Sequence, residues 1–76
     1  MNTYRKAKYF TTLRDWLRTN MIKTRLTQRE VGKLAGISQS YVSQLSSGYY
    51  TTPTLGVVRN LAEAFDDNVD DVWDLC

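Results

Sequence analysis

The side chains best suited to chemistry in this sequence are uncharged hydrogen-bonding groups gathered in one short segment, residues 38–47 (SQSYVSQLSS). If the segment is a helix with Val42 and Leu45 turned inward at i, i+3 spacing, its outward face carries Ser38, Gln39, Ser40, Tyr41, Ser43, Gln44 and Ser47. Short amides and hydroxyls without charge are suited to hydrogen-bonding base edges in a DNA major groove. A glutamine amide can bond adenine through two atoms.

Two short helices joined by a glycine turn are predicted to position this face. Thr27 and Glu30 have the spacing of a capping box, which starts a helix at about residue 28. Gly36 suits the left-handed conformation that commonly ends a helix. The expected helices therefore span about residues 28–35 and 39–47.

The order of these residues resembles the helix-turn-helix of phage repressor and Cro proteins, the xenobiotic-response-element (XRE) type regulators. The resemblance covers roughly residues 26–73, with a looser match upstream to about Phe10, and it is carried by Gln28, Val31-Gly32, Gly36-Ile37, Val42, Leu45, Gly48, Pro53-Thr54-Leu55, Leu61-Ala62-Glu63-Ala64-Phe65 and Val69-Asp70-Asp71-Val72. It implies a compact all-α, five-helix, lambda-repressor-like DNA-binding domain with a central helix-turn-helix. The implied function is transcriptional regulation, with the third helix reading an operator from the major groove.

The resemblance also implies roles for individual residues. In the family, the first position of the second helix, Gln28 here, bonds a phosphate and often buttresses a glutamine on the third helix. We expect base readout by Gln28, Ser38, Gln39, Ser40 and Gln44, and backbone contacts by Arg29, Lys33, Tyr41, Ser43, Ser47, Tyr49 and Thr51. For each of these the alternative is a solvated surface side chain. Tyr41 could instead touch a thymine methyl group or pack under the Tyr49 loop.

One departure from the family concerns charge. The family often carries Lys or Arg after the glycine that ends the third helix, whereas this chain has YYTT at residues 49–52. Hydroxyl and backbone donors position a protein on DNA without adding charge. The ionic contribution would then come from other cations, for which the candidates are Arg29, Lys33, Arg25, Lys23, Arg5, Lys6 and Lys8.

Charge is distributed unevenly along the chain. Residues 1–33 carry nine Lys/Arg and two Asp/Glu, residues 34–58 carry no charged side chain, and residues 59–76 carry Arg59 against six acidic residues. A basic end, a neutral polar middle and an acidic end suggest that one pole faces an anion while the other turns away, which favours nucleic-acid binding. The alternative is that both ends are simply solvated.

The rest of the chain is predicted to complete one domain over residues 1–76, with residues 1–9 as a possible flexible basic arm. The apolar spacing predicts a first helix from Phe10 or Thr11 to Met21 and a connector at 23–26, and Thr54 and Asn68 can cap two later helices. Asp66 and Asp67 stand where the family has glycine and then a small apolar residue. The expected core is Leu17, Val31, Leu34, Ile37, Val42, Leu45, Val58, Leu61 and Phe65, with Leu55 on the inward face of the fourth helix.

Composition argues against several other classes of protein. One cysteine and no histidine leave no disulfide framework and no Cys/His zinc site. There is no glycine-rich phosphate loop and no histidine to activate Cys76, so we expect no enzyme, cofactor or metal. No apolar run is long enough to span a membrane and no signal peptide is found, so we expect a cytoplasmic protein.

The expected partner is a palindromic double-stranded DNA operator, bound by a weak homodimer through Val69, Val72 and Trp73. The alternative for Trp73 is that it closes the monomer core against the first helix. Two other uses of the same fold stay open, namely the antitoxin of a toxin–antitoxin pair and a protein-interaction module that has lost DNA binding.

Overall fold

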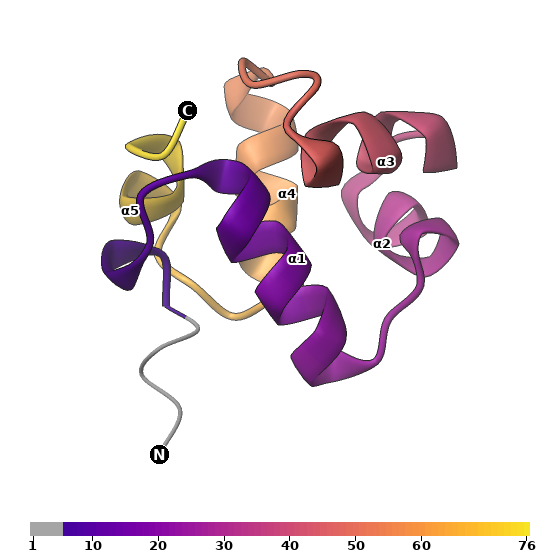
Figure 1. Ribbon diagram of the computed structural model, residues 1–76, viewed down its shortest axis with the longest axis horizontal. Helices are drawn as coiled ribbons and strands as arrows, with labels where there is room; N and C mark the ends of the chain where they lie inside the picture. The colour runs from indigo at the N-terminus through magenta and orange to yellow at the C-terminus, as the bar shows by residue number, and fades with distance from the viewer. Residues whose placement is uncertain (1–5) are drawn as a thin grey trace.

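The computed structural model describes residues 6–76, and these form five α-helices around one core (Figure 1). The elements are the 3-10 turn η2 (Ala7–Tyr9), α1 (Leu13–Thr24), α2 (Gln28–Ala35), α3 (Gln39–Ser47), α4 (Leu55–Ala64) and α5 (Val69–Trp73), with no strand in this part of the chain. In Figure 1, α2 and α3 lie on one side of α1 and α4, while α5 and η2 lie on the other. The predicted fold class is confirmed.

The helices begin where the sequence provides a capping side chain. Thr12, Thr27, Ser38, Thr54 and Asn68 each accept a hydrogen bond from the third backbone N–H of the helix that follows. Such caps satisfy donors that a helix start leaves without a partner. The predicted bounds of α2 and α3 are confirmed, as are the caps at Thr54 and Asn68.

The predicted bounds of α1 were wrong at both ends. Thr12 has extended backbone and its hydroxyl caps Asp15 N at 3.2 Å, so the helix begins at Leu13 and not at Phe10 or Thr11. The helix continues to Thr24 because its terminating residue is Arg25, which adopts the left-handed conformation at φ 58°. Half of the expected connector, Lys23 and Thr24, therefore belongs to α1.

The core contains most of the predicted residues, with two corrections. Leu17, Val31, Val42, Leu45, Val58, Leu61 and Phe65 are buried together, joined by Trp16, Ala35 and Val72. Leu34 is 54% exposed and Leu55 is 46% exposed, contrary to expectation, and Ile37 is only partly buried. At about 100° per residue, the buried face of α2 is centred between Val31 and Ala35, which leaves Leu34 to one side. Leu55 is the first residue of α4.

The Asp67 carboxylate joins the N-terminal segment to α1 and α5. Its Oδ2 accepts hydrogen bonds from Ala7 N at 2.7 Å and Trp16 Nε1 at 2.8 Å, while Oδ1 accepts from Asn68 N at 2.7 Å. Lys6 Nζ donates to Asp66 O at 2.8 Å. Residues 6–9 of the expected basic arm are thus packed beside α5, and residues 1–5, which include Arg5, lie outside the described residues. The basic and acidic ends meet here, so the two poles predicted from charge are not fully separate.

Candidate nucleic-acid interface

The outward face of α3 presents the uncharged polar groups that the sequence predicted. Gln39, Ser40, Ser43 and Gln44 are all exposed, while Val42 and Leu45 on the opposite face are fully buried. The spacing of one, four and five residues places the four polar side chains on one side of the helix. Neither glutamine amide is hydrogen-bonded by another residue in the part of the chain that the structure describes. The face is therefore free to bond an outside partner.

The turn between α2 and α3 holds this face at a fixed angle. Gly36 ends α2 in the left-handed conformation at φ 72°, and Ile37 N donates to Gly32 O at 2.9 Å. A Cβ atom on Gly32 would lie 2.7 Å from Ile37 O, closer than real Cβ contacts, so the turn packs directly on the α2 backbone. Asn60 Nδ2 of α4 donates to Ala35 O at 3.1 Å. A reading helix needs this kind of rigid support to keep its register.

Two of the predicted base-reading residues lie at the starts of helices. The Ser38 hydroxyl oxygen caps α3 by accepting from Tyr41 N at 3.0 Å, although its proton remains available as a donor. Gln28 is half-buried at the start of α2, where it lines a shallow hollow with Arg18, Met21 and Ser46. Gln28 thus adjoins α3 from the side, and its base contact stays a prediction.

The residues predicted to contact the DNA backbone at the end of α3 and in the loop after it differ in their exposure. Tyr41 is half-buried, and the centre of its ring lies 5.4 Å from the centre of the Tyr50 ring. Burial is the main cause that raises the pKa of Tyr41, and the neighbouring Tyr50 phenol raises this pKa further. Tyr49 is 82% exposed and Thr51 is exposed. Ser47 Oγ donates to Gln44 O at 3.2 Å. Tyr49 and Thr51 are accessible to a ligand, whereas much of the Tyr41 ring is covered by its neighbours.

The predicted cations Arg29 and Lys33 are exposed one helical turn apart on α2. Glu30 lies between them in the sequence, and its Oε1 accepts from Thr27 N at 2.9 Å while Thr27 Oγ1 accepts from Glu30 N at 3.1 Å. This reciprocal pair is the capping box that the sequence predicted. Hydrogen bonds to Thr27, and then the Lys33 charge, lower the pKa of Glu30.

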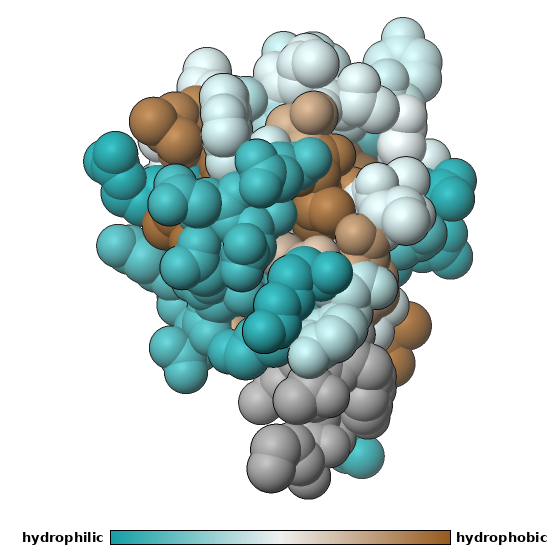
Figure 2. Space-filling view, turned by 90° about the vertical axis from the view of Figure 1, so that its left-hand side faces the viewer, coloured by the Kyte–Doolittle hydropathy of each residue, from teal (hydrophilic) through white to brown (hydrophobic). Residues whose placement is uncertain are grey.

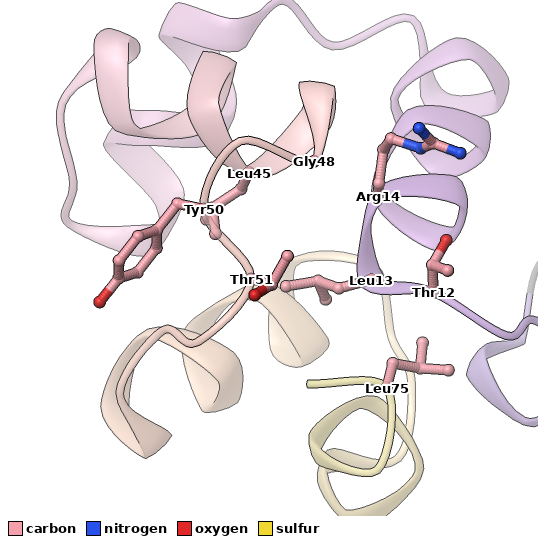
Figure 3. Close-up of a pocket in the computed structure, with 8 residues that line it drawn as sticks. All are labelled: Thr12, Leu13, Arg14, Leu45, Gly48, Tyr50, Thr51 and Leu75. Atoms are coloured by element: carbon pink, nitrogen blue, oxygen red, sulfur yellow. The ribbon is translucent and has the colours of Figure 1, made fainter.

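Two arginines beside α3 were missed by the sequence reasoning. Arg14 and Arg18 are exposed one turn apart on α1, and α1 packs against α3. A Cβ atom built on Gly48 would lie 3.1 Å from Arg14 Cδ and 3.7 Å from Arg14 Nη1, so this side chain covers the end of α3. Figure 3 shows Arg14 beside Gly48 at the rim of a cavity of about 260 Å³, with its guanidinium directed away from Leu75. The i, i+4 spacing was a signal that both arginines share one face of α1, but not which helix that face adjoins.

Five of the eight acidic residues gather around α5, on the other side of the molecule. Asp70 and Asp71 belong to α5, Asp66 and Asp67 precede it, and Asp74 follows it. Figure 2 shows this side, where strongly hydrophilic side chains lie beside a narrower strip of hydrophobic ones. In residues 6–76 no group of three or more His, Cys, Asp or Glu is arranged to hold a metal ion. No helix of this part has both the length and the apolar character needed to cross a membrane.

The expected self-association surface is partly inaccessible. Val72 is fully buried in the monomer, whereas Trp73 is 43% exposed and Val69 is half-buried. Val72 therefore cannot form a surface contact, and its predicted place in the dimer contact was wrong. Trp73 does not close the monomer core, so the alternative for this residue was wrong as well. The tryptophan that does so is Trp16, whose ring meets Phe65 edge-on at 5.5 Å.

Comparison with known proteins gives one match. A family model described as helix-turn-helix matches residues 17–70, which span α2, the turn, α3 and α4 together with most of α1. No curated protein and no solved structure gave a match. With most of its length matched, the chain belongs to the helix-turn-helix family of XRE-type, Cro/C1-like proteins, a family of DNA-binding regulators.

Proposed function

We propose that this protein is a sequence-specific transcriptional regulator, a repressor in its simplest form, that inserts α3 into the major groove of an operator. The observation that carries the proposal is the exposed, uncharged polar face of α3 held by a rigid, capped turn. Gln39 and Ser40 are at the N-terminal end of α3, the part of a recognition helix that contacts base edges. Gln44 lies one turn further along the same face.

The remaining predicted residues fit positions around this helix. Ser38 and Gln28 stand at the starts of α3 and α2, where backbone N–H groups and helix dipoles favour a phosphate. Ser43, Ser47, Tyr49 and Thr51 are exposed beside the reading face and offer neutral donors for the DNA backbone. Arg29 and Lys33 offer charge from α2. Tyr41 contributes by supporting Tyr50 and the loop more than by direct contact.

The experiment is selection of bound sequences from a pool of random duplex DNA, followed by binding measurements on the winning sequence. Gln39→Ala should lose about 1–3 kcal/mol on the selected duplex and little on a scrambled one, because it removes base readout. Ser46→Ala serves as a matched control, since Ser46 lies on the same helix but is buried and bonds Ser43 O. Equal losses on both duplexes would show that Gln39 only positions the backbone. No enriched sequence and no DNA binding at low salt would favour a protein-interaction module.

We further propose that two protomers bind a palindromic site as a weak dimer. A single copy offers one short reading helix, and specific affinities of about 10⁻⁸–10⁻¹¹ M are hard to reach that way. The accessible contact residues are Trp73 and Val69, next to acidic residues of α5 that would repel across a two-fold axis. Sedimentation should show a monomer–dimer equilibrium for the protein without DNA and two protomers on the selected DNA, and one protomer per site at saturation would refute the dimer.

A further inference from the structure

The reading helix and its loop have no charge of their own. No residue from 34 to 58 carries a charged side chain, and this span contains all of α3, the loop after it and the start of α4. DNA binding depends strongly on cations that meet phosphates, because each such contact releases condensed counterions. Any cations that serve α3 must therefore come from elements packed beside it.

Among the described elements, α1 supplies cations directly at the edge of α3. The Arg14 side chain lies beside Gly48, the residue that ends α3, because a Cβ atom built on Gly48 would lie 3.1 Å from Arg14 Cδ. Arg18 lines a hollow together with Gln28 at the start of α2 and Ser46 near the end of α3. The two arginine side chains thus lie beside the C-terminal half of α3, Arg14 at Gly48 and Arg18 near Ser46.

Both arginines are available to an external anion. Arg14 has an ion pair with its neighbour Asp15, but the Nε–Oδ1 distance is 3.4 Å and both side chains are about half exposed, at 45% and 46%. Exposed pairs of this kind contribute little and are readily exchanged. No carboxylate of residues 6–76 pairs with Arg18, and most of the acidic residues lie around α5. By contrast, Lys6 is bonded to Asp66 O and Lys8 lines a hollow with Asp71 and Asp74.

We infer that Arg14 and Arg18 of α1 bind backbone phosphates of the DNA strand that flanks α3, and so supply the charge that α3 and its loop lack. This inference rests on the proposed function, since it concerns the same DNA complex. Arginine suits this position because its planar group can bond a phosphate through two N–H donors. The competing explanation is structural: the Arg14 guanidinium would complement the negative end of the α3 dipole and bind nothing else.

The test measures binding of the full chain to a fluorescently labelled duplex of mixed sequence, over about 50–200 mM salt. Arg14→Gln and Arg18→Gln remove the charge and keep part of the aliphatic stem. Each should lower the slope of log affinity against log salt by about 0.9 and weaken binding to every duplex alike. Arg14→Lys should restore the slope. Lys8→Gln is the control, because the structure places this candidate cation beside Asp71 and Asp74 on the α5 side, away from α3. It removes an equal charge and should leave the slope unchanged.

The outcomes separate this inference from the proposed function. If the unmodified chain binds the duplex but both arginine variants retain its slope, the inference is overturned and the proposed function stands. If Lys8→Gln lowers the slope as much as the arginine variants do, the effect is one of net charge, which also overturns it. If the unmodified chain binds no duplex DNA at low salt, both fall. Thermal melts of each variant check that lost affinity is not lost folding.

Discussion

Replacing Asp67 by alanine should destabilise the domain far more than an exposed acidic residue would. The carboxylate receives N–H groups from Ala7 and Trp16, both of which are fully buried, and from Asn68 at the start of α5. A buried donor left without an acceptor costs about 1–3 kcal/mol. Water can reach part of this site, since Asp67 itself is only half-buried, so we expect a total loss of about 2–4 kcal/mol.

The loss is large against the whole stability of such a domain. The free energy of unfolding expected for a chain of this length is roughly 4–11 kcal/mol. The melting temperature of the variant should therefore be about 10–20 °C below that of the unmodified protein. Urea denaturation followed by far-ultraviolet circular dichroism measures the change. Asp74→Ala is the control, because it removes the same charge from an exposed position after α5 and should stay within about 0.5 kcal/mol of the unmodified protein.

A double-mutant cycle attributes the loss to one bond. Trp16→Phe removes the indole N–H and keeps an aromatic ring against Phe65. In that background Asp67→Ala should cost about 1–2 kcal/mol less than it does alone. The reasoning is refuted if Asp67→Ala costs no more than Asp74→Ala, or if its cost is the same with and without the Trp16 indole.

Two further predictions concern the helix-turn-helix itself. Gly32→Ala should destabilise by roughly 1–3 kcal/mol despite the better helix propensity of alanine, because its Cβ would lie 2.7 Å from Ile37 O, and a melt that is neutral or higher would contradict the close packing. Glu30→Gln should lower the melting temperature at neutral pH and not at low pH. The hydrogen bonds to Thr27 lower the pKa of Glu30 in the folded state. The stability that the Glu30 carboxylate contributes is therefore fully present above its pKa in the unfolded chain, and it is lost as the pH falls through its pKa in the folded protein. Glu63→Gln on α4 is the charge-matched control, and an equal deficit at both pH values would count against the capping-box charge.

The parts of the fold that could be predicted are those determined by neighbours in the sequence. The bounds of α2 and α3 follow from capping residues and from glycines that end helices, all within a few positions of one another. The outward face of α3 follows as well, because Val42 and Leu45 fix which side is inward. These are local rules, so a short segment is sufficient to apply them.

The parts that could not be predicted depend on contacts between distant segments. Asp67 was noted only as a departure from a family pattern, and its partners Ala7 and Trp16 lie 60 and 51 positions away in the sequence. Arg14 precedes Gly48 by 34 positions, so the charges near the motif in the sequence did not indicate that Arg14 lies beside α3. The prediction that Leu34 is buried was wrong for another reason, because helical spacing identifies the apolar side of a helix without giving the centre of its buried face.

The cations proposed to contact phosphates lie on α1 and α2, whereas the residues proposed to contact bases are uncharged, and this arrangement affects how specificity should depend on salt. If Arg14, Arg18 and the α2 cations meet phosphates, they act on every duplex alike, because phosphates carry no sequence information. Base discrimination then depends on uncharged groups, those of α3 and the amide of Gln28. If the same phosphate contacts form in the specific and non-specific complexes, salt weakens both complexes to the same extent. The ratio of the two affinities should therefore change little with salt, even though each affinity falls steeply. A ratio that falls with salt would mean that some cation forms its phosphate contact only on the correct sequence.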